Sequence, residues 1–91
     1  MYENLFQPIQ VGGVSIPNRI VRSAHGTLLT GEAAIAYHEA RARGGVGMIT
    51  LEATSVHRKA PSSVPLYSDD VLPYYRAISQ RIHAHGTVLF Q

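Results

Sequence analysis

The sequence predicts an α/β fold with a parallel sheet, and three observations support this prediction. Three short apolar stretches alternate with two amphipathic ones, in the order strand, helix, strand, helix, strand. Residues 48–51 are nearly all apolar and show no regular alternation with polar residues, which is typical of a strand buried on both faces of a parallel sheet. The run from Arg41 to Ala53 joins a helix end, a glycine stop and this strand. Two successive strand–helix–strand units imply right-handed crossovers.

The composition limits the classes of protein to which the chain belongs. With 91 residues, of which 45% are hydrophobic and 15% charged, it is expected to form at most one globular domain. A net charge of +2, spread along the chain, gives no reason to expect a nucleic-acid partner. The absence of cysteine excludes disulfides and thiolate metal sites within these residues. There is no apolar run of about 18 residues and no signal-peptide pattern, so we expect a cytoplasmic protein without a membrane partner.

The first quarter of the sequence predicts a hairpin and then a strand. Residues 8–17 alternate apolar and polar around Gly12-Gly13, a typical two-residue turn. Pro17 ends the second arm, and residues 20–24 are expected to form the first strand of the parallel sheet. Residues 25–31 contain two glycines and are expected to be irregular.

A first helix is predicted from about Glu32, with Thr30 as its N-cap. Arg41 and Arg43 suit its last turn, where cations face the negative end of the helix dipole. Gly44 is expected to adopt the left-handed conformation that closes the helix. Helical spacing places four residues on one face, which is expected to pack against the core: Ala33, Ala36, Tyr37 and Ala40.

A second helix follows a long loop at residues 54–68, and loops of this length in small domains are often functional. One residue of the pair Asp69-Asp70 is expected to cap this helix, with Pro73 in its first turn. Gly86 ends the helix, and residues 87–90 begin a third strand. The expected apolar stripe of the helix consists of Val71, Tyr74 or Tyr75, Ile78 and Ile82.

The order of elements also predicts the larger architecture. Three parallel strands with two helices leave two open sheet edges, and the sequence ends within a unit. We therefore expect residues 1–91 to be the N-terminal portion, a hairpin plus about three strands, of a TIM (β/α)8 barrel, which needs roughly 250 residues. Such barrels bind ligands at the C-terminal ends of their strands. Here these ends are Ser23-Ala24, Glu52-Ala53 and Gln91.

At these residues the chain resembles the N-terminal part of the old yellow enzyme family, the FMN-dependent NAD(P)H:flavin oxidoreductases. The matching segments follow the family's order and cover nearly the whole chain: residues 5–9, 16–21, 41–49, 52–53 and 83–86. Many members have proline and methionine after the first strand, then threonine or cysteine near the reactive flavin nitrogen. Here Ala24-His25-Gly26 stands there, and residues 23–27 lean towards the dienoyl-CoA reductase and amine dehydrogenase side of the family. Those longer proteins add an iron–sulfur cluster and a nucleotide-binding module for FAD.

The resemblance implies a partial FMN-binding domain over residues 1–91 and assigns cofactor-binding residues. Ala53 matches the small residue that lets the flavin approach closely. Gln91 matches the glutamine whose amide hydrogen-bonds the polar edge of the isoalloxazine ring. Four residues follow the first strand, where the family lays backbone and short side chains along the ring: Ser23, Ala24, His25 and Gly26. No catalytic residue and no metal ligand are expected here, because the family's substrate-binding and proton-donating residues lie on later strands.

The implied function is that of an FMN-dependent oxidoreductase, which passes a hydride from NAD(P)H through FMN to an activated alkene of the enone or enoyl type. Its partner would be a small-molecule electron acceptor, and a homo-oligomer is left open for the full-length protein. One alternative is that the 91-residue chain alone is a truncated, inactive product. Another is a metal-dependent hydrolase on a similar barrel, suggested by five histidines.

Several polar residues have a structural as well as a functional interpretation. His25 either lines the flavin pocket or is an ordinary loop residue. Glu52 either faces the site or caps the end of its strand by accepting from backbone N–H groups. His38 is expected at the surface, as is His57 in the long loop. The pair His83 and His85 suits the end of a helix, where the dipole favours a cation, better than a metal site.

Overall fold

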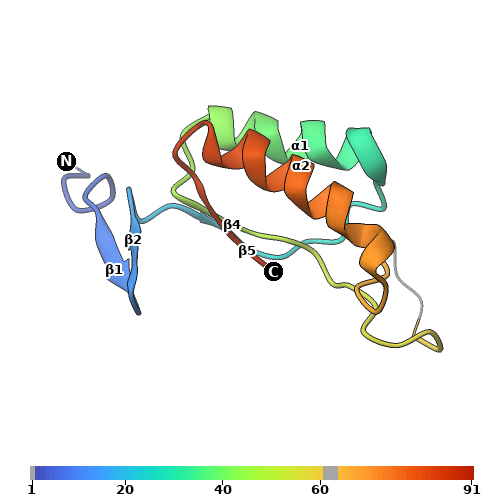
Figure 1. Cartoon of the computed structure of the whole chain (residues 1–91). Coiled ribbons are helices and arrows are strands. Elements are labelled where there is room, and N and C mark those ends of the chain that lie inside the picture. The colour runs from blue at the N-terminus through green and yellow to red at the C-terminus, as the bar shows by residue number, and fades with distance from the viewer. Residues whose placement is uncertain (1, 61–63) are drawn as a thin grey trace.

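The computed structural model describes residues 2–60 and 64–91, which form a hairpin beside a small α/β unit (Figure 1). Strands β1 (Ile9–Val11) and β2 (Val14–Ile16) pair antiparallel across the predicted Gly12-Gly13 turn. The hairpin is thus confirmed. It lies to one side of the helices and of the main sheet (Figure 1).

The main sheet has three parallel strands, as the sequence predicts. They are β3 (Val21–Arg22), β4 (Met48–Thr50) and β5 (Val88–Phe90), in the order β3-β4-β5. Arg22 pairs with Ile49, which pairs with Leu89. The three strands therefore end at nearly the same level, and the segments that follow them emerge together at one edge.

Two helices cover one face of this sheet (Figure 1). Helix α1 (Gly31–Arg43) runs beside α2 (Leu72–His83), and a short 3-10 helix η1 (Asp69–Val71) leads into α2. The predicted apolar stripe of α2 is confirmed, with Tyr74 and Tyr75 both packed against the core. The core is formed by Ile35, Ala42, Ile49, Leu51, Ile78 and Ile82.

The predicted buried face of α1 is wrong. The three alanines of that face, Ala33, Ala36 and Ala40, are exposed, and Tyr37 is half-buried. Alanine is small enough to suit core and surface alike, so alanines at helical spacing do not identify the packed face. The buried residues lie one or two positions away and are Ala34, Ile35, His38 and Ala42. The expectation that His38 lies at the surface is therefore also wrong.

The helix caps differ in detail from the prediction. Thr30 is the N-cap of α1 with extended backbone, but its side chain makes no capping hydrogen bond. Ser68, rather than Asp69-Asp70, caps the start of η1, where its hydroxyl accepts from the Asp70 amide at 3.3 Å. At the end of α1, Gly44 is still right-handed with φ −70°, and the left-handed residue is Gly45 with φ +99°.

The N-terminal edge of the sheet is closed by a tight set of contacts around Asn18. Its Nδ2 donates to the Gly45 carbonyl at 2.8 Å, and its Oδ1 accepts from the Ile20 amide at 3.0 Å. Gly47 lies directly against this residue, because a Cβ there would stand 2.5 Å from Asn18 Oδ1 and 2.7 Å from its carbonyl oxygen. Only glycine fits at this position.

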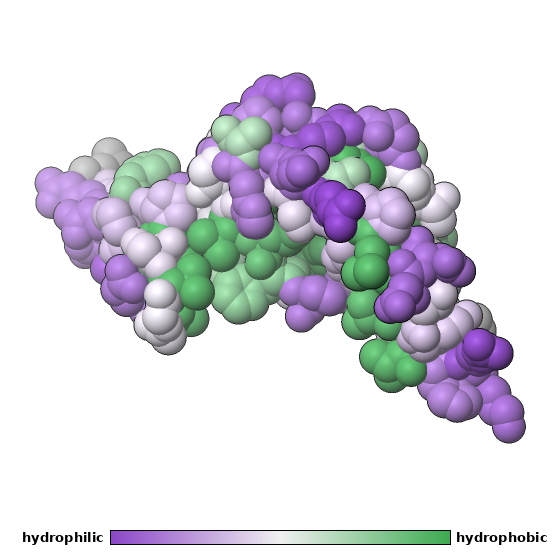
Figure 2. Space-filling view, viewed as in Figure 1, coloured by the Kyte–Doolittle hydropathy of each residue, from purple (hydrophilic) through white to green (hydrophobic). Residues whose placement is uncertain are grey.

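The loop after β4 has little regular structure in its described residues. Ser55 and Pro65 form an isolated bridge, while residues 61–63 of the predicted loop lie outside the described part. Hydrophobic side chains gather on the side of the molecule away from the helices (Figure 2). Within residues 2–60 and 64–91, neither helix has the length and apolar character needed to cross a membrane.

Candidate functional site

The candidate site lies at the C-terminal edge of the main sheet. Residues 23–30 follow β3, residues 51–53 follow β4, and Gln91 follows β5. The parallel register places the ends of these strands side by side, as the Leu51 amide shows by donating to the Phe90 carbonyl at 2.8 Å. The structure thus brings the six predicted site residues to one edge. Whether they bind a cofactor remains a prediction.

The predicted site residues present an open rim with no carboxylate, lysine or arginine side chain among the six. Residues 23–26 are exposed and have no regular secondary structure, and Ala53 and Gln91 are exposed as well. A Cβ added to Gly26 would meet no atom within 4 Å, so there is free space beside it. Short side chains and accessible backbone of this kind suit the face of a flat aromatic ligand.

Gln91 is the most strongly oriented of these residues. Its Oε1 accepts from the Tyr75 hydroxyl at 2.6 Å, and its Nε2 donates to the Glu52 carbonyl at 3.0 Å. An amide has two N–H donors and two acceptor lone pairs, so one of each remains available. The amide plane is therefore fixed while its outer donor and acceptor stay free.

Glu52 is buried at the end of β4, with 7% of its surface exposed. Its Oε2 accepts from the Thr27 amide at 2.8 Å, and its Oε1 accepts from the Thr27 hydroxyl at 2.9 Å. Burial by itself raises the pKa of Glu52, but the hydrogen bonds from Thr27 and His38 together lower it below the usual value. The carboxylate therefore accepts from a backbone N–H group, although from the loop after β3 rather than from its own strand.

His38 stands behind Glu52 and is fully buried in α1. Its Nε2 lies 3.5 Å from Glu52 Oε1, the long limit for a hydrogen bond. Burial lowers the pKa of His38, and the bond to Glu52 offsets this only in part, so the ring is neutral near pH 7. Because a carboxylate only accepts, Nε2 carries the proton. Among the described residues, Nδ1 has no hydrogen-bond partner.

Sequence reasoning missed three members of this network, which are Thr27, His38 and Tyr75. Thr27 is two residues beyond His25, and its role depends on a bond to a residue 25 positions away. A hydroxyl residue in the loop after one strand and an acid at the end of the next is the pattern that could have indicated it. The position of His38 was detectable from Ile35 and Ala42, with which it shares the buried face of α1.

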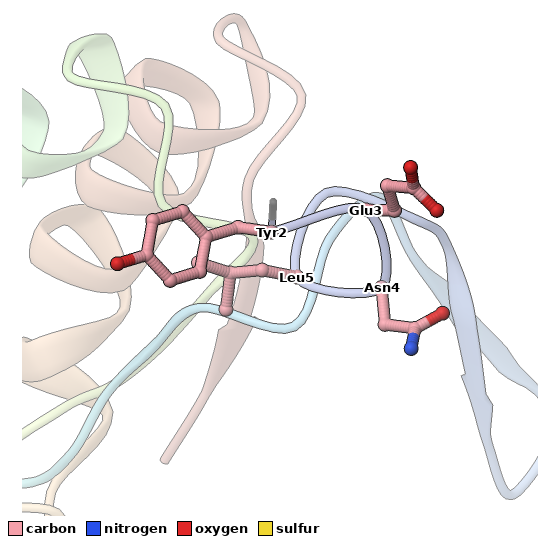
Figure 3. Close-up of a pocket in the computed structure, with 4 residues that line it drawn as sticks. All are labelled: Tyr2, Glu3, Asn4 and Leu5. Carbon is pink, nitrogen blue, oxygen red and sulfur yellow. The ribbon is translucent and has the colours of Figure 1, made fainter.

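Among the residues that the structure describes, two of the hollows lie away from these hydrogen bonds. One of about 220 Å³ lies between the loop after β3 and the start of α2, and it is lined by Thr30, Gly31, Val64, Pro65, Asp70, Val71 and Tyr74. The other is lined by four consecutive residues near the N-terminus: Tyr2, Glu3, Asn4 and Leu5. In Figure 3, Tyr2 and Leu5 point to one side while Glu3 points to the other, so these side chains do not converge on a ligand.

Comparison with known proteins identifies the family. Residues 4–90 match the model of the NADH:flavin oxidoreductase / NADH oxidase family. The chain belongs to this family. The resemblance to the old yellow enzymes, drawn from the sequence segments, is thereby confirmed, whereas the leaning towards one subgroup stays a prediction.

The chain is similar to several longer members of the family. It is 31% identical over 96 residues to the N,N-dimethylglycine/sarcosine dehydrogenase of Chromohalobacter salexigens, covering 93% of this chain and 14% of that protein. It is 32% identical over 94 residues to the multifunctional alkene reductase/demethylase OYE of Caballeronia cordobensis, with shares of 93% and 14%. The chain therefore spans about a seventh of the length of these relatives.

A solved structure supports the predicted architecture. The old yellow enzyme homologue from Zymomonas mobilis superimposes with a TM-score of 0.77 at 25% identity, covering 96% of this chain and 26% of that one. Its barrel fold confirms that the hairpin, strands and helices correspond to the N-terminal part of a TIM barrel.

Proposed function

We propose that these residues form part of the FMN site of an NAD(P)H-dependent oxidoreductase. The observation that carries the proposal is the amide of Gln91, which hydrogen bonds to Tyr75 and Glu52 hold at the C-terminal edge of the sheet. The family to which the chain belongs is described by NADH and flavin. The chain's net charge and lack of a basic cluster agree with a small-molecule electron acceptor as its partner rather than nucleic acid.

The residues present fit a flavin. The free N–H and lone pair of Gln91 match the donors and acceptors of the pyrimidine edge of the ring. Ala53 leaves room for close approach, and residues 23–26 offer backbone and short side chains to a ring face. When FMN is bound, the hydride chemistry is the cofactor's own. These residues bind and orient it, and no acid, base or metal ligand is required of them.

We further propose an activated alkene, such as an enone or an enoyl thioester, as the electron acceptor. A relative named as an alkene reductase/demethylase supports this class, while one named as an N,N-dimethylglycine/sarcosine dehydrogenase offers amine oxidation as the competing reaction. Nothing favours a metal-dependent hydrolase. In the described part of the chain, no three histidine, aspartate or glutamate residues are grouped to hold a metal, and His85 pairs with Glu39 at 3.3 Å.

The test of FMN binding uses the complete product of the gene that encodes these residues. The purified protein is expected to keep a flavin absorption band after desalting. Gln91→Ala is expected to weaken FMN binding about tenfold, which corresponds to the loss of about one hydrogen bond. Gln80→Ala is the matched control, because Gln80 is exposed on α2. A protein that binds no added FMN, or a Gln91→Ala variant of unchanged affinity, would contradict the proposal.

A second test uses the small residue after β4. Ala53→Leu is expected to weaken FMN binding more strongly than Gln91→Ala, because the larger side chain occupies the space left for the ring. Ala36→Leu is its control, since Ala36 is exposed on α1. Consumption of NAD(P)H in the presence of a cyclic enone would support the alkene class. Activity with an N-methyl amine alone would instead support the competing reaction.

The 91-residue chain expressed by itself is expected to bind FMN weakly or not at all and to be inactive, since it supplies only part of a cofactor cradle. Stoichiometric flavin binding by this chain would overturn that expectation.

A further inference from the structure

The hydrogen bonds of Glu52 join the segments that follow all three strands of the main sheet. Its side chain reaches Thr27, which follows β3, through two bonds of 2.8 and 2.9 Å. Its backbone carbonyl accepts from the amide of Gln91, which follows β5, at 3.0 Å. Glu52 itself follows β4. One buried residue therefore links the chain segments that follow the three strands.

The backbone conformation of the loop after β3 also indicates that other residues hold this loop in place. Leu28 has φ +63°, the left-handed region that residues with a side chain rarely adopt, and its side chain is 92% exposed. No packing of Leu28 itself explains this conformation. The two flanking residues explain the conformation of Leu28. The Thr27 hydroxyl donates to Glu52 and also accepts from the Leu29 amide at 3.1 Å, so both neighbours of Leu28 are held. The backbone strain at Leu28 is thus maintained by the Thr27–Glu52 contact.

His38 completes the arrangement from the helix side. It is fully buried, and its Nε2 lies 3.5 Å from Glu52 Oε1. A buried carboxylate needs such partners, because it cannot draw its hydrogen bonds from water. With the imidazole in place, the Glu52 carboxylate is satisfied by Thr27 and His38 and is left no free orientation.

We propose that Glu52, supported by His38, is a positioning residue that holds the loop 23–30 and the Gln91 amide in the arrangement that receives the flavin, without contacting the flavin itself. This inference rests on the proposed function, because FMN is the ligand that the loop 23–30 and the Gln91 amide would bind together. It assigns roles to Glu52, His38 and Thr27, which are separate from the six predicted cofactor-binding residues.

The test compares two threonines in the complete gene product. Thr27→Val removes the hydroxyl bond to Glu52 with little change of shape, and Thr27→Ser keeps it. Thr87→Val is the matched control, because the buried Thr87 hydroxyl donates to the Val46 carbonyl at 2.8 Å, at the opposite edge of the sheet. Two quantities are measured: amide hydrogen exchange of residues 23–30 without FMN, and the FMN dissociation constant with the visible circular dichroism of the bound flavin.

Thr27→Val is expected to speed exchange in residues 23–30 about tenfold, to weaken FMN binding about tenfold and to change the flavin dichroism. Thr27→Ser is expected to restore all three to within about twofold. Thr87→Val is expected to lower overall stability but to leave the three quantities unchanged. Glu52→Gln is expected to act like Thr27→Val on the loop, and it keeps the backbone carbonyl that accepts from the Gln91 amide.

Unchanged exchange in Thr27→Val, failure of Thr27→Ser to restore it, or an equal effect of Thr87→Val would overturn the proposal. If Glu52→Gln fails to fold, the comparison of Thr27→Val with Thr27→Ser still tests the proposal. Both variants are expected to fold, since Thr27 is only half-buried. The two proposals fail separately. A wild-type protein that binds no FMN contradicts the proposed function, while the exchange measurement without FMN still tests the role of Glu52.

Discussion

At the N-terminal edge of the main sheet, the chain is closed by glycine and by one asparagine whose amide bonds to the backbone of Gly45 and Ile20. At the C-terminal edge the contacts are made by side chains from distant positions, and short exposed residues surround them. The left-handed residues at the first edge, Gly45 and Gly86, are glycines, whereas the second edge has left-handed Leu28 as well as Gly31. The first edge is built for close packing at low strain. The second retains strain and open space, which is typical of ligand sites.

The largest expected effect on stability comes from a substitution at the N-terminal edge of the sheet. Gly47→Ala places a Cβ at 2.5 Å from Asn18 Oδ1 and 2.7 Å from its backbone oxygen, and the backbone oxygen cannot rotate away. We expect a loss of about 2–3 kcal/mol in the free energy of unfolding, measured by urea denaturation. Gly26→Ala at the other edge is the comparison, because its Cβ would meet nothing within 4 Å. Equal losses in the two variants would show that the edges do not differ in packing.

The second effect concerns the backbone at the end of α1. Gly45 has φ +99° and open space around its Cα, so Gly45→Ala costs conformational strain without a clash. We expect a loss of about 1–2 kcal/mol in the free energy of unfolding. Gly44→Ala, at φ −70°, carries no such strain, although its Cβ would lie 3.3 Å from the Arg41 carbonyl oxygen. A larger loss in Gly44→Ala would contradict the assignment of Gly45 as the helix-closing residue.

The glycines between α1 and β4 also show which features can be predicted from the sequence. The run Gly44 to Gly47 correctly predicted a stop between a helix and a buried strand, since several glycines next to an apolar run allow few other structures. It could not tell which glycine is left-handed, because the end of a helix is set by its packing and not by the glycine alone. It also could not indicate that Gly47 faces Asn18, 29 positions earlier, because this depends on how the hairpin meets the sheet.

The same limit explains the results at the C-terminal edge. The common location of Ser23, Ala53 and Gln91 could be predicted from the expected ends of the strands, because parallel strands end at a common edge. The bonds of Glu52 to Thr27 and His38 cross 25 and 14 positions and require the register of β3 against β4. For this reason Glu52 was left with two interpretations. His38 was assigned to the surface, whereas three alanines and Tyr37 pointed to the wrong face of α1.

The third effect is a pH dependence specific to the C-terminal edge. Burial lowers the pKa of His38, and the nearby Arg22 and Arg41 add to this, against the raising effect of Glu52. A base whose pKa is lower in the folded state binds protons more readily when unfolded. Its contribution to stability is complete above its unfolded pKa of about 6.5 and is lost as pH falls through the folded value.

We therefore expect the melting temperature to fall as the pH drops below about 6.5, before the pH reaches the range below about 4.5 in which Glu52, with its lowered pKa, is protonated. His38→Gln is expected to flatten this part of the pH profile, because glutamine keeps an N–H donor but does not titrate. His83→Gln is the control, as His83 is exposed at the end of α2. An unchanged profile in His38→Gln would contradict the buried, neutral state of His38.

The smallest effect on stability is expected at Leu28. Leu28→Gly removes the strain of the left-handed conformation, which favours the folded state by about 1–2 kcal/mol. The same change lets the unfolded chain adopt more conformations, which costs about 0.5–1 kcal/mol. Since the leucine side chain is 92% exposed, almost no burial is lost. The free energy of unfolding should therefore stay within about 1 kcal/mol of wild type or rise slightly, in contrast to the loss in Gly45→Ala. A decrease of more than about 1 kcal/mol in the free energy of unfolding would mean that the Leu28 side chain makes stabilising contacts. The C-terminal edge would then be closed by packing in the same way as the N-terminal edge.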